Sequence, residues 1–167
     1  ALYHDSAVVL LEDSKIIVAI QEERITRIKH DSSFPLNSIQ YILKKNNLTL
    51  NEIDYVVYYD KPFLKFERLL ETYLHFAPKG FKSFKIALPI WIKEKLFLKN
   101  LLIRELKKID SKFNKQKLLF SEHHLSHAAS AFYPSPFNKA IILTLDGVGE
   151  WSTTTVAIGD GNKIDSK

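Results

Sequence analysis

Residues 121–150, SEHHLSHAASAFYPSPFNKAIILTLDGVGE, carry the pattern that decides the fold. The stretch from Glu122 to Phe132 is rich in alanine and stops before Pro134, which predicts a helix. Residues 140–146, AIILTLD, are strongly apolar and predict a buried strand that ends at Asp146 in a glycine-containing loop. A helix followed by such a strand indicates an α/β protein.

Further strands and helices are predicted on both sides of this stretch. Two β-rich runs, residues 6–13 and 15–23, predict an antiparallel hairpin on either side of Ser14. A helix of about ten residues should begin after Asn37 or Ser38. Three further short strands are expected at residues 54–60, 117–120 and 151–159, and Asp160-Gly161 predicts a hairpin turn after the last. The sequence therefore predicts a mixed sheet with helices on its faces.

Residues 62–110 differ from the rest because they are long, helical in pattern and rich in aromatic residues and lysine. We expect Pro78–Gly80 and Pro89 to divide them into three helices. In the last helix Leu96, either Leu101 or Leu102, and Leu106 share one face, with lysines opposite. The segment is too long for a simple connection, so we interpret it as an inserted helical subdomain or lid. The expected divisions are a first-lobe sheet and helix at 1–61, the inserted helical subdomain at 62–116, a metal-motif helix and core strand at 117–146, and the truncated start of a second lobe at 147–167.

The composition excludes several classes of protein. The chain of 167 residues is 46% hydrophobic and 12% aromatic, which rules out disorder of the whole chain. Because cysteine is absent, a disulfide scaffold, an iron–sulfur site and a thiol nucleophile are excluded, and a reducing compartment is compatible. No apolar run predicts a membrane span. The net charge of +5 is concentrated in residues 80–117, which hold 11 Lys+Arg and 3 Asp+Glu. That segment is either a solvated helix face or a surface for an anionic partner.

The densest group of chemically active residues lies in the predicted helix. His123 and His127 are four residues apart, so a helix puts both imidazoles on one face, where they can share a metal ion. Asp146 is the natural third ligand because it follows a buried strand, where ligands bind in open α/β sheets. The alternative is a helix whose histidine rings only cap or pack. His124 points elsewhere on the helix.

Three weaker signals accompany this group. Gly147 and Gly149 could let backbone N–H groups approach a phosphate, although such a loop is more often only a turn. His4 could act as a general base or be an ordinary loop histidine. Lys29 belongs to a group of cations after the hairpin that could hold an anionic substrate or form surface ion pairs.

Taken together, four motifs resemble the N-terminal part of the carbamoyltransferases of the NodU/CmcH type, which carbamoylate hydroxyl groups of nodulation factors and antibiotics. The motifs are HDSAVVLLEDSKIIVAIQEERITRIKHD (4–31), SSFP (32–35), SEHHLSHAASAFYPSPF (121–137) and ILTLDGVGEWSTT (142–154). They occur in the family's order, and FERLLETYLHFAPKGFKSF (66–84) also looks typical of bacterial members. The resemblance implies the actin/sugar-kinase/heat-shock-protein ATPase fold, which is ribonuclease H-like. It also implies that this chain is a fragment.

The resemblance implies a reaction and roles for residues. Carbamoyl phosphate and ATP would give a carbamoyl-adenylate in a second domain, and the carbamoyl group would pass to a hydroxyl of a small-molecule acceptor. His123, His127 and Asp146 resemble ligands of a divalent metal, expected to be Fe²⁺. His4 resembles the residue near the acceptor hydroxyl, and Lys29 a contact to the carbamoyl or phosphate group. Gly147 and Gly149 belong to the loop that approaches the nucleotide.

The resemblance also sets further expectations. The adenylate-forming domain and one metal-binding carboxylate would lie outside this chain, so we expect the chain to be catalytically incompetent alone. We expect a cytoplasmic enzyme with no nucleic-acid partner and no transmembrane segment, and homodimerisation is left open. Two competing hypotheses are an ATPase or kinase of the same superfamily and a basic helical membrane-binding module at residues 80–117. The paired histidines favour the carbamoyltransferase, because phosphotransfer in that superfamily needs no imidazole metal site.

Overall fold

The computed structural model describes residues 1–13, 15–92, 97–147 and 149–166. Its contacts divide the chain into two compact units. Unit 1 comprises Ala1–Tyr55 and Asn100–Lys117, and unit 2 comprises Val56–Lys99 and Leu118–Lys167. The division reflects only which residues contact one another most densely, and it does not identify the lobes of a known fold. The lobe boundaries expected from the sequence therefore stay predictions.

Unit 1 begins with the predicted hairpin. β1 (Ala7–Glu12) pairs antiparallel with β2 (Lys15–Gln21), with Val8 opposite Ile20 and a register shift between Leu10 and Leu11. Ser14, the expected break between the two runs, lies outside the described residues. A short helix α1 (Glu23–Thr26) and the predicted helix α2 (Leu36–Lys45) follow.

A buried carboxylate joins the end of the hairpin to the start of α2. The helix has Pro35 at its N-cap and lacks a capping side chain of its own. Glu22, which is 1% exposed, takes this role: its carboxylate accepts hydrogen bonds from the backbone N–H groups of Asn37 and Ser38 at 3.0 and 2.8 Å. The negative charge is placed where unpaired N–H groups and the helix dipole favour it. The loop that carries Lys29 is therefore anchored at both ends.

Helix α5 (Leu98–Ile109) confirms the predicted amphipathic helix. Leu102 and Leu106 are 3% and 1% exposed, and Lys107 and Lys108 are exposed. Of the alternatives Leu101 and Leu102, the second is buried on the core side. Leu96, which was also expected on this face, lies outside the described residues. A 3-10 turn, η2 (Lys115–Lys117), follows after the chain leaves α5.

Unit 2 begins with β3 (Val56–Tyr58), which pairs in parallel with β4 (Leu118–Phe120). Two helices follow β3: α3 (Pro62–Phe76) and α4 (Phe81–Trp91), joined by the predicted break at residues 77–80. Tyr73 and Phe84 pack across this junction with ring centroids 4.7 Å apart. The prediction that Pro89 divides two helices is wrong, because Pro89 lies inside α4. A proline ring fixes φ at a helical value but removes one backbone hydrogen bond, and α4 ends two residues after Pro89, at Trp91.

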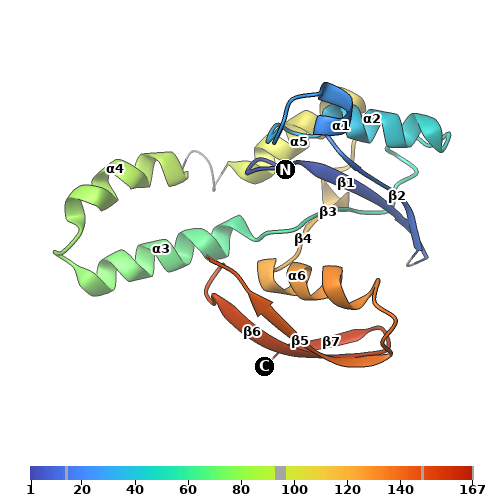
Figure 1. Cartoon of the computed structure of the whole chain (residues 1–167). Helices are drawn as coiled ribbons and strands as arrows, with labels where there is room; N and C mark the ends of the chain where they lie inside the picture. Colours follow the sequence, from blue (N-terminus) through green and yellow to red (C-terminus); the bar gives the residue numbers. More distant parts are fainter. Residues whose placement is uncertain (14, 93–96, 148, 167) are drawn as a thin grey trace. The chain divides into compact units, whose positions relative to one another are not determined.

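The remainder of unit 2 is a three-stranded antiparallel sheet covered by one helix (Figure 1). Its strands are β5 (Lys139–Leu145), β6 (Thr154–Asp160) and β7 (Lys163–Ser166), in that order. The predicted turn lies between β6 and β7, where Gly161 adopts a φ of +60°. Helix α6 (His123–Phe132) buries Ala128 and Phe132 against Ile142 and Ala157 of the sheet. This packing fixes α6 over the end of β5.

The predicted strands are thus present, but β6 starts at Thr154 rather than at Trp151. Within the described residues the strands form three small sheets and not one continuous mixed sheet. A physical reason is the shortness of β3 and β4, whose ladder spans three residue pairs. The α/β class is confirmed, and the actin-like fold stays a prediction. None of the described helices is long and apolar enough to cross a membrane.

Candidate metal centre

Helix α6 is held at its N-terminal end by contacts with the chain just after β3. The backbone N–H of Ser121 donates to the carbonyl of Tyr58 at 2.8 Å, and the Ser126 hydroxyl donates to the carbonyl of Tyr59 at 3.1 Å. On another face of the helix, Nδ1 of His124 lies 2.9 Å from Oγ1 of Thr155 in β6. His124 thus contacts the sheet on another face of α6 than His123 and His127, and this contact helps to fix the rotation of the helix.

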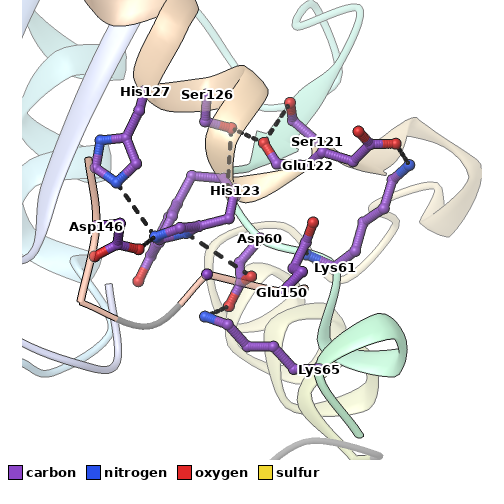
Figure 2. Close-up of polar contacts among 12 residues, drawn as sticks. Asp60, Lys61, Lys65, Ser121, Glu122, His123, Ser126, His127, Asp146 and Glu150 are labelled. Carbon is purple, nitrogen blue, oxygen red and sulfur yellow. Dashed lines mark hydrogen bonds and ion pairs between the residues drawn. The ribbon is translucent and has the colours of Figure 1, made fainter. Parts of the chain in front are cut away.

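The three predicted metal ligands converge at this end of the helix (Figure 2). Nε2 of His123 lies 3.2 Å from Nε2 of His127, because residues four apart share a helix face. The same His123 atom lies 2.8 Å from Oδ2 of Asp146, directly after β5. One ligand atom from each residue lies within 4.8 Å of the other two. The predicted proximity of His123, His127 and Asp146 is therefore present.

These separations fit a shared cation. Ligand bonds of about 2.0–2.1 Å at tetrahedral or octahedral angles put neighbouring ligand atoms about 2.8–3.4 Å apart. The donor set of two imidazoles and one carboxylate suits zinc or iron and leaves coordination positions open. Burial holds the pKa of His123 below its usual value, and the Lys65 cation lowers it further, although Asp60 and Asp146 act in the opposite direction. A lowered pKa favours the neutral imidazole, which is the form that binds metal.

A second layer of charged groups surrounds His123. Asp60, two residues after β3, forms an ion pair with Lys65 at 2.8 Å, and its other carboxylate oxygen lies 3.9 Å from Nδ1 of His123. Glu150 accepts a hydrogen bond from the backbone N–H of Lys61 at 2.6 Å. Burial raises the pKa of Glu150, and the neighbouring Asp60 carboxylate adds to this effect. The first turn of α3 is therefore linked to both His123 and the loop after Asp146.

The two predicted nucleotide-loop glycines have different surroundings. A Cβ added to Gly149 would lie 2.1 Å from the Ser152 carbonyl oxygen and 2.6 Å from Nε2 of His124, whereas one added to Gly147 would meet nothing within 4 Å. The guanidinium of Arg68 also donates to the Gly149 carbonyl. Gly149 is thus required by close packing. A role of either glycine in nucleotide binding stays a prediction.

We expect Gly149→Ala to destabilise the chain by about 1–3 kcal/mol, since overpacking against backbone forces the structure to shift. The matched control is Gly147→Ala, which adds the same methyl group to open space and should change stability by less than about 0.5 kcal/mol. Urea unfolding of the three proteins measures the difference. Equal stability of the two variants would contradict the packing role of Gly149.

The other predicted catalytic residues, His4 and Lys29, belong to unit 1. Nδ1 of His4 lies 2.9 Å from Oδ2 of Asp5, and Oδ1 of Asp5 lies 2.8 Å from Nδ1 of His30. Asp5 and His30 both have positive φ, at 45° and 56°. Hydrogen bonding to the two histidines lowers the pKa of Asp5, and the same carboxylate raises the pKa of His30. Asp5 therefore stays ionised and orients His4.

Lys29 is exposed, and among the described residues it makes no hydrogen bond or ion pair. Its ammonium group is available to an anion. Asp5, Glu23 and His30 also bring ligand-type atoms within 4.8 Å of one another. In this group, however, His30 already contacts Asp5, and its backbone N–H donates to Glu23 at 3.0 Å. We therefore interpret this second group as a hydrogen-bond network that shapes the loop.

Sequence reasoning did not assign Asp60, Lys65 or Glu150 to the site. One signal could have found Asp60: like Asp146, it comes shortly after an apolar strand, and ligands bind beyond the carboxyl ends of strands in α/β proteins. Glu150 directly follows Gly149, and its position beside the glycine loop gives no separate signal. Lys65 lies in a helix rich in charged residues, where its sequence context does not distinguish it.

Comparison with known proteins establishes the family. The family model for the carbamoyltransferase N-terminus matches residues 1–166. The chain belongs to this carbamoyltransferase family. An uncharacterized protein of Synechocystis is 53% identical over 98% of this chain and 27% of its own length. The nodulation protein NolNO of Sinorhizobium fredii is 37% identical over 96% of this chain and 22% of its own length.

An archaeal relative extends the comparison. An uncharacterized protein of Methanocaldococcus jannaschii is 34% identical over 89% of this chain and 30% of its own length. The chain thus spans about a quarter of the length of the curated relatives it matches. The resemblance stated from the motifs is confirmed at the level of the family.

Proposed function

We propose that the chain supplies the metal-binding part of the transfer site of an O-carbamoyltransferase. In this proposal ATP and carbamoyl phosphate give a carbamoyl-adenylate with release of phosphate and pyrophosphate, and the carbamoyl group then passes to a hydroxyl of a small-molecule acceptor. The observation that supports the proposal is the convergence of His123, His127 and Asp146 in a chain of the carbamoyltransferase family. We further propose that the enzyme works in the cytoplasm and that the metal is Fe²⁺.

The three candidate metal-binding residues would contribute a bound cation to the transfer site. His123, His127 and Asp146 would hold a divalent cation through two nitrogen atoms and one oxygen atom. The bound cation would supply positive charge that polarises the carbamoyl group or neutralises phosphate. The open coordination positions leave room for a substrate oxygen and for a ligand from outside this chain.

His4 and Lys29 have the chemistry for the transfer itself. Asp5 accepts from Nδ1 of His4, which leaves Nε2 as the acceptor for the proton of the attacking hydroxyl. As the hydroxyl oxygen bonds to the carbamoyl carbon, the bond from that carbon to the phosphate oxygen breaks, and AMP leaves. The free ammonium of Lys29 would stabilise the negative charge that develops on the leaving group.

The test uses the protein extended to the length of its curated relatives, with ATP, labelled carbamoyl phosphate and a panel of hydroxylated acceptors. We expect AMP release and label transfer that depend on the acceptor and are lost in His4→Ala. The 167-residue chain alone should be inactive. Release of ADP with no carbamoylated product would favour the kinase or ATPase alternative, and robust transfer by the chain alone would contradict its expected incompetence.

A further inference from the structure

We propose that Asp60 is a positioning residue for the metal centre, which holds the His123 ring with Nε2 directed at the cation. In the metal-loaded protein its carboxylate would accept a hydrogen bond from the Nδ1–H of His123. The inference rests on the metal site proposed above. Asp60 does not itself touch the cation in this proposal.

The first observation is a pair of unsatisfied buried atoms. Nδ1 of His123 and Oδ1 of Asp60 are both buried and without a hydrogen bond among the described residues. They face each other at 3.9 Å. Burying a polar atom without a partner costs free energy, so such atoms are rare in native proteins. The two atoms are complementary, because a ring N–H can donate to a carboxylate oxygen.

Metal chemistry gives the reason for the pairing. When Nε2 of a histidine binds a cation, the ring proton must reside on Nδ1. In metalloproteins that N–H usually donates to a carboxylate, a carbonyl or a water, which fixes the ring and makes the ligand more basic. Charge-assisted bonds of this kind are about 2.7–2.9 Å long, so the present gap would close by about 1 Å.

The surroundings hold Asp60 in place for this role (Figure 2). The Asp60 side chain is 6% exposed, and its second oxygen, Oδ2, is engaged by Lys65 at 2.8 Å. The Tyr59 ring contacts the His123 ring, with centroids 5.8 Å apart. The Glu150 carboxyl lies beside Asp60. Lys65 thus leaves Oδ1 as the oxygen that faces His123, and Tyr59 restricts the ring.

The experiment compares zinc binding by the 167-residue chain and two variants, Asp60→Ala and Asp60→Asn. Affinity is measured by competition with a chelator. The Nδ1–H resonance of His123 is followed by NMR in the zinc-loaded, ¹⁵N-histidine-labelled proteins. Loss of an outer-layer partner typically weakens metal binding about 10–100-fold, and we expect this for Asp60→Ala, together with rapid exchange of the Nδ1–H. Asp60→Asn keeps an acceptor oxygen and the side-chain shape, so its affinity should lie between those of the parent and Asp60→Ala.

The matched control is Asp160→Asn, which removes an exposed carboxylate of the same unit that pairs with Lys139. Its affinity should equal that of the parent. If Asp60→Ala does not fold, the isosteric Asp60→Asn carries the test. Parent-like affinity and an unchanged Nδ1–H signal in the folded Asp60 variants would overturn the inference and leave the metal site standing. Failure of the parent to bind zinc would instead overturn the proposed metal site, and the inference with it.

Discussion

Replacing His123 with alanine is expected to abolish stoichiometric metal binding by the chain. Nε2 of His123 lies 3.2 Å from Nε2 of His127 and 2.8 Å from the Asp146 carboxylate, so it is close to both other candidate ligands. Loss of a residue that only holds a metal ligand in place typically weakens metal binding about 10–100-fold. Loss of a ligand itself should have a larger effect, so we expect His123→Ala to weaken binding by more than about 100-fold. Elemental analysis of the purified parent and variant after metal loading and gel filtration measures the difference.

The adjacent histidine provides the control for this prediction. His124 belongs to the same helix, but its ring contacts Thr155 of β6. His124→Ala removes the same number of imidazoles and should retain one metal per chain, provided that circular dichroism shows a folded protein. Equal metal content in the parent and His123→Ala would count against the assignment. Equal loss in both variants would indicate that the effect comes from damage to α6 and not from ligand removal.

The convergence of His123, His127 and Asp146 could be predicted from local sequence because two simple rules coincide. The spacing of His123 and His127 places their rings on one helix face, and Asp146 directly follows an apolar strand. The core contacts of Ala128 and Phe132 with the sheet then bring the helix face to the strand end. Each rule involves a few neighbouring residues, and the packing of one helix on one sheet connects them.

The second layer of the site could not be predicted in this way. Asp60 and Glu150 approach His123 from segments that are distant in sequence from each other, and no periodic pattern relates them. The same limit applies to Glu22, whose sequence context indicates a strand end. Its carboxylate instead serves the start of α2, fifteen and sixteen residues later. Pro89 gives an error of the opposite kind. A proline usually indicates a helix break, but α4 continues through Pro89 to Trp91.

Replacing Phe132 with alanine should have the largest effect on the stability of unit 2. Phe132 is 4% exposed and packs with Ala128, Ile142 and Ala157 between α6 and the sheet. Its ring also covers Gly159, since a Cβ added there would lie 2.5 Å from Phe132 Cζ. Truncating a buried phenylalanine costs about 3–5 kcal/mol. That is a large part of the about 5–15 kcal/mol by which a typical domain is stable.

Thermal and urea unfolding of three single variants and one double variant can separate this packing from a general effect of losing an aromatic ring. Phe137→Ala removes an exposed ring, 63% accessible, and should change stability by less than about 0.5 kcal/mol. Gly159→Ala should destabilise the parent through the clash with Phe132. In the Phe132→Ala background the same methyl group enters vacated space, so the two effects should be strongly non-additive. Additive effects would show that Phe132 and Gly159 are not in contact, and would remove the structural basis for placing α6, with His123 and His127, beside Asp146.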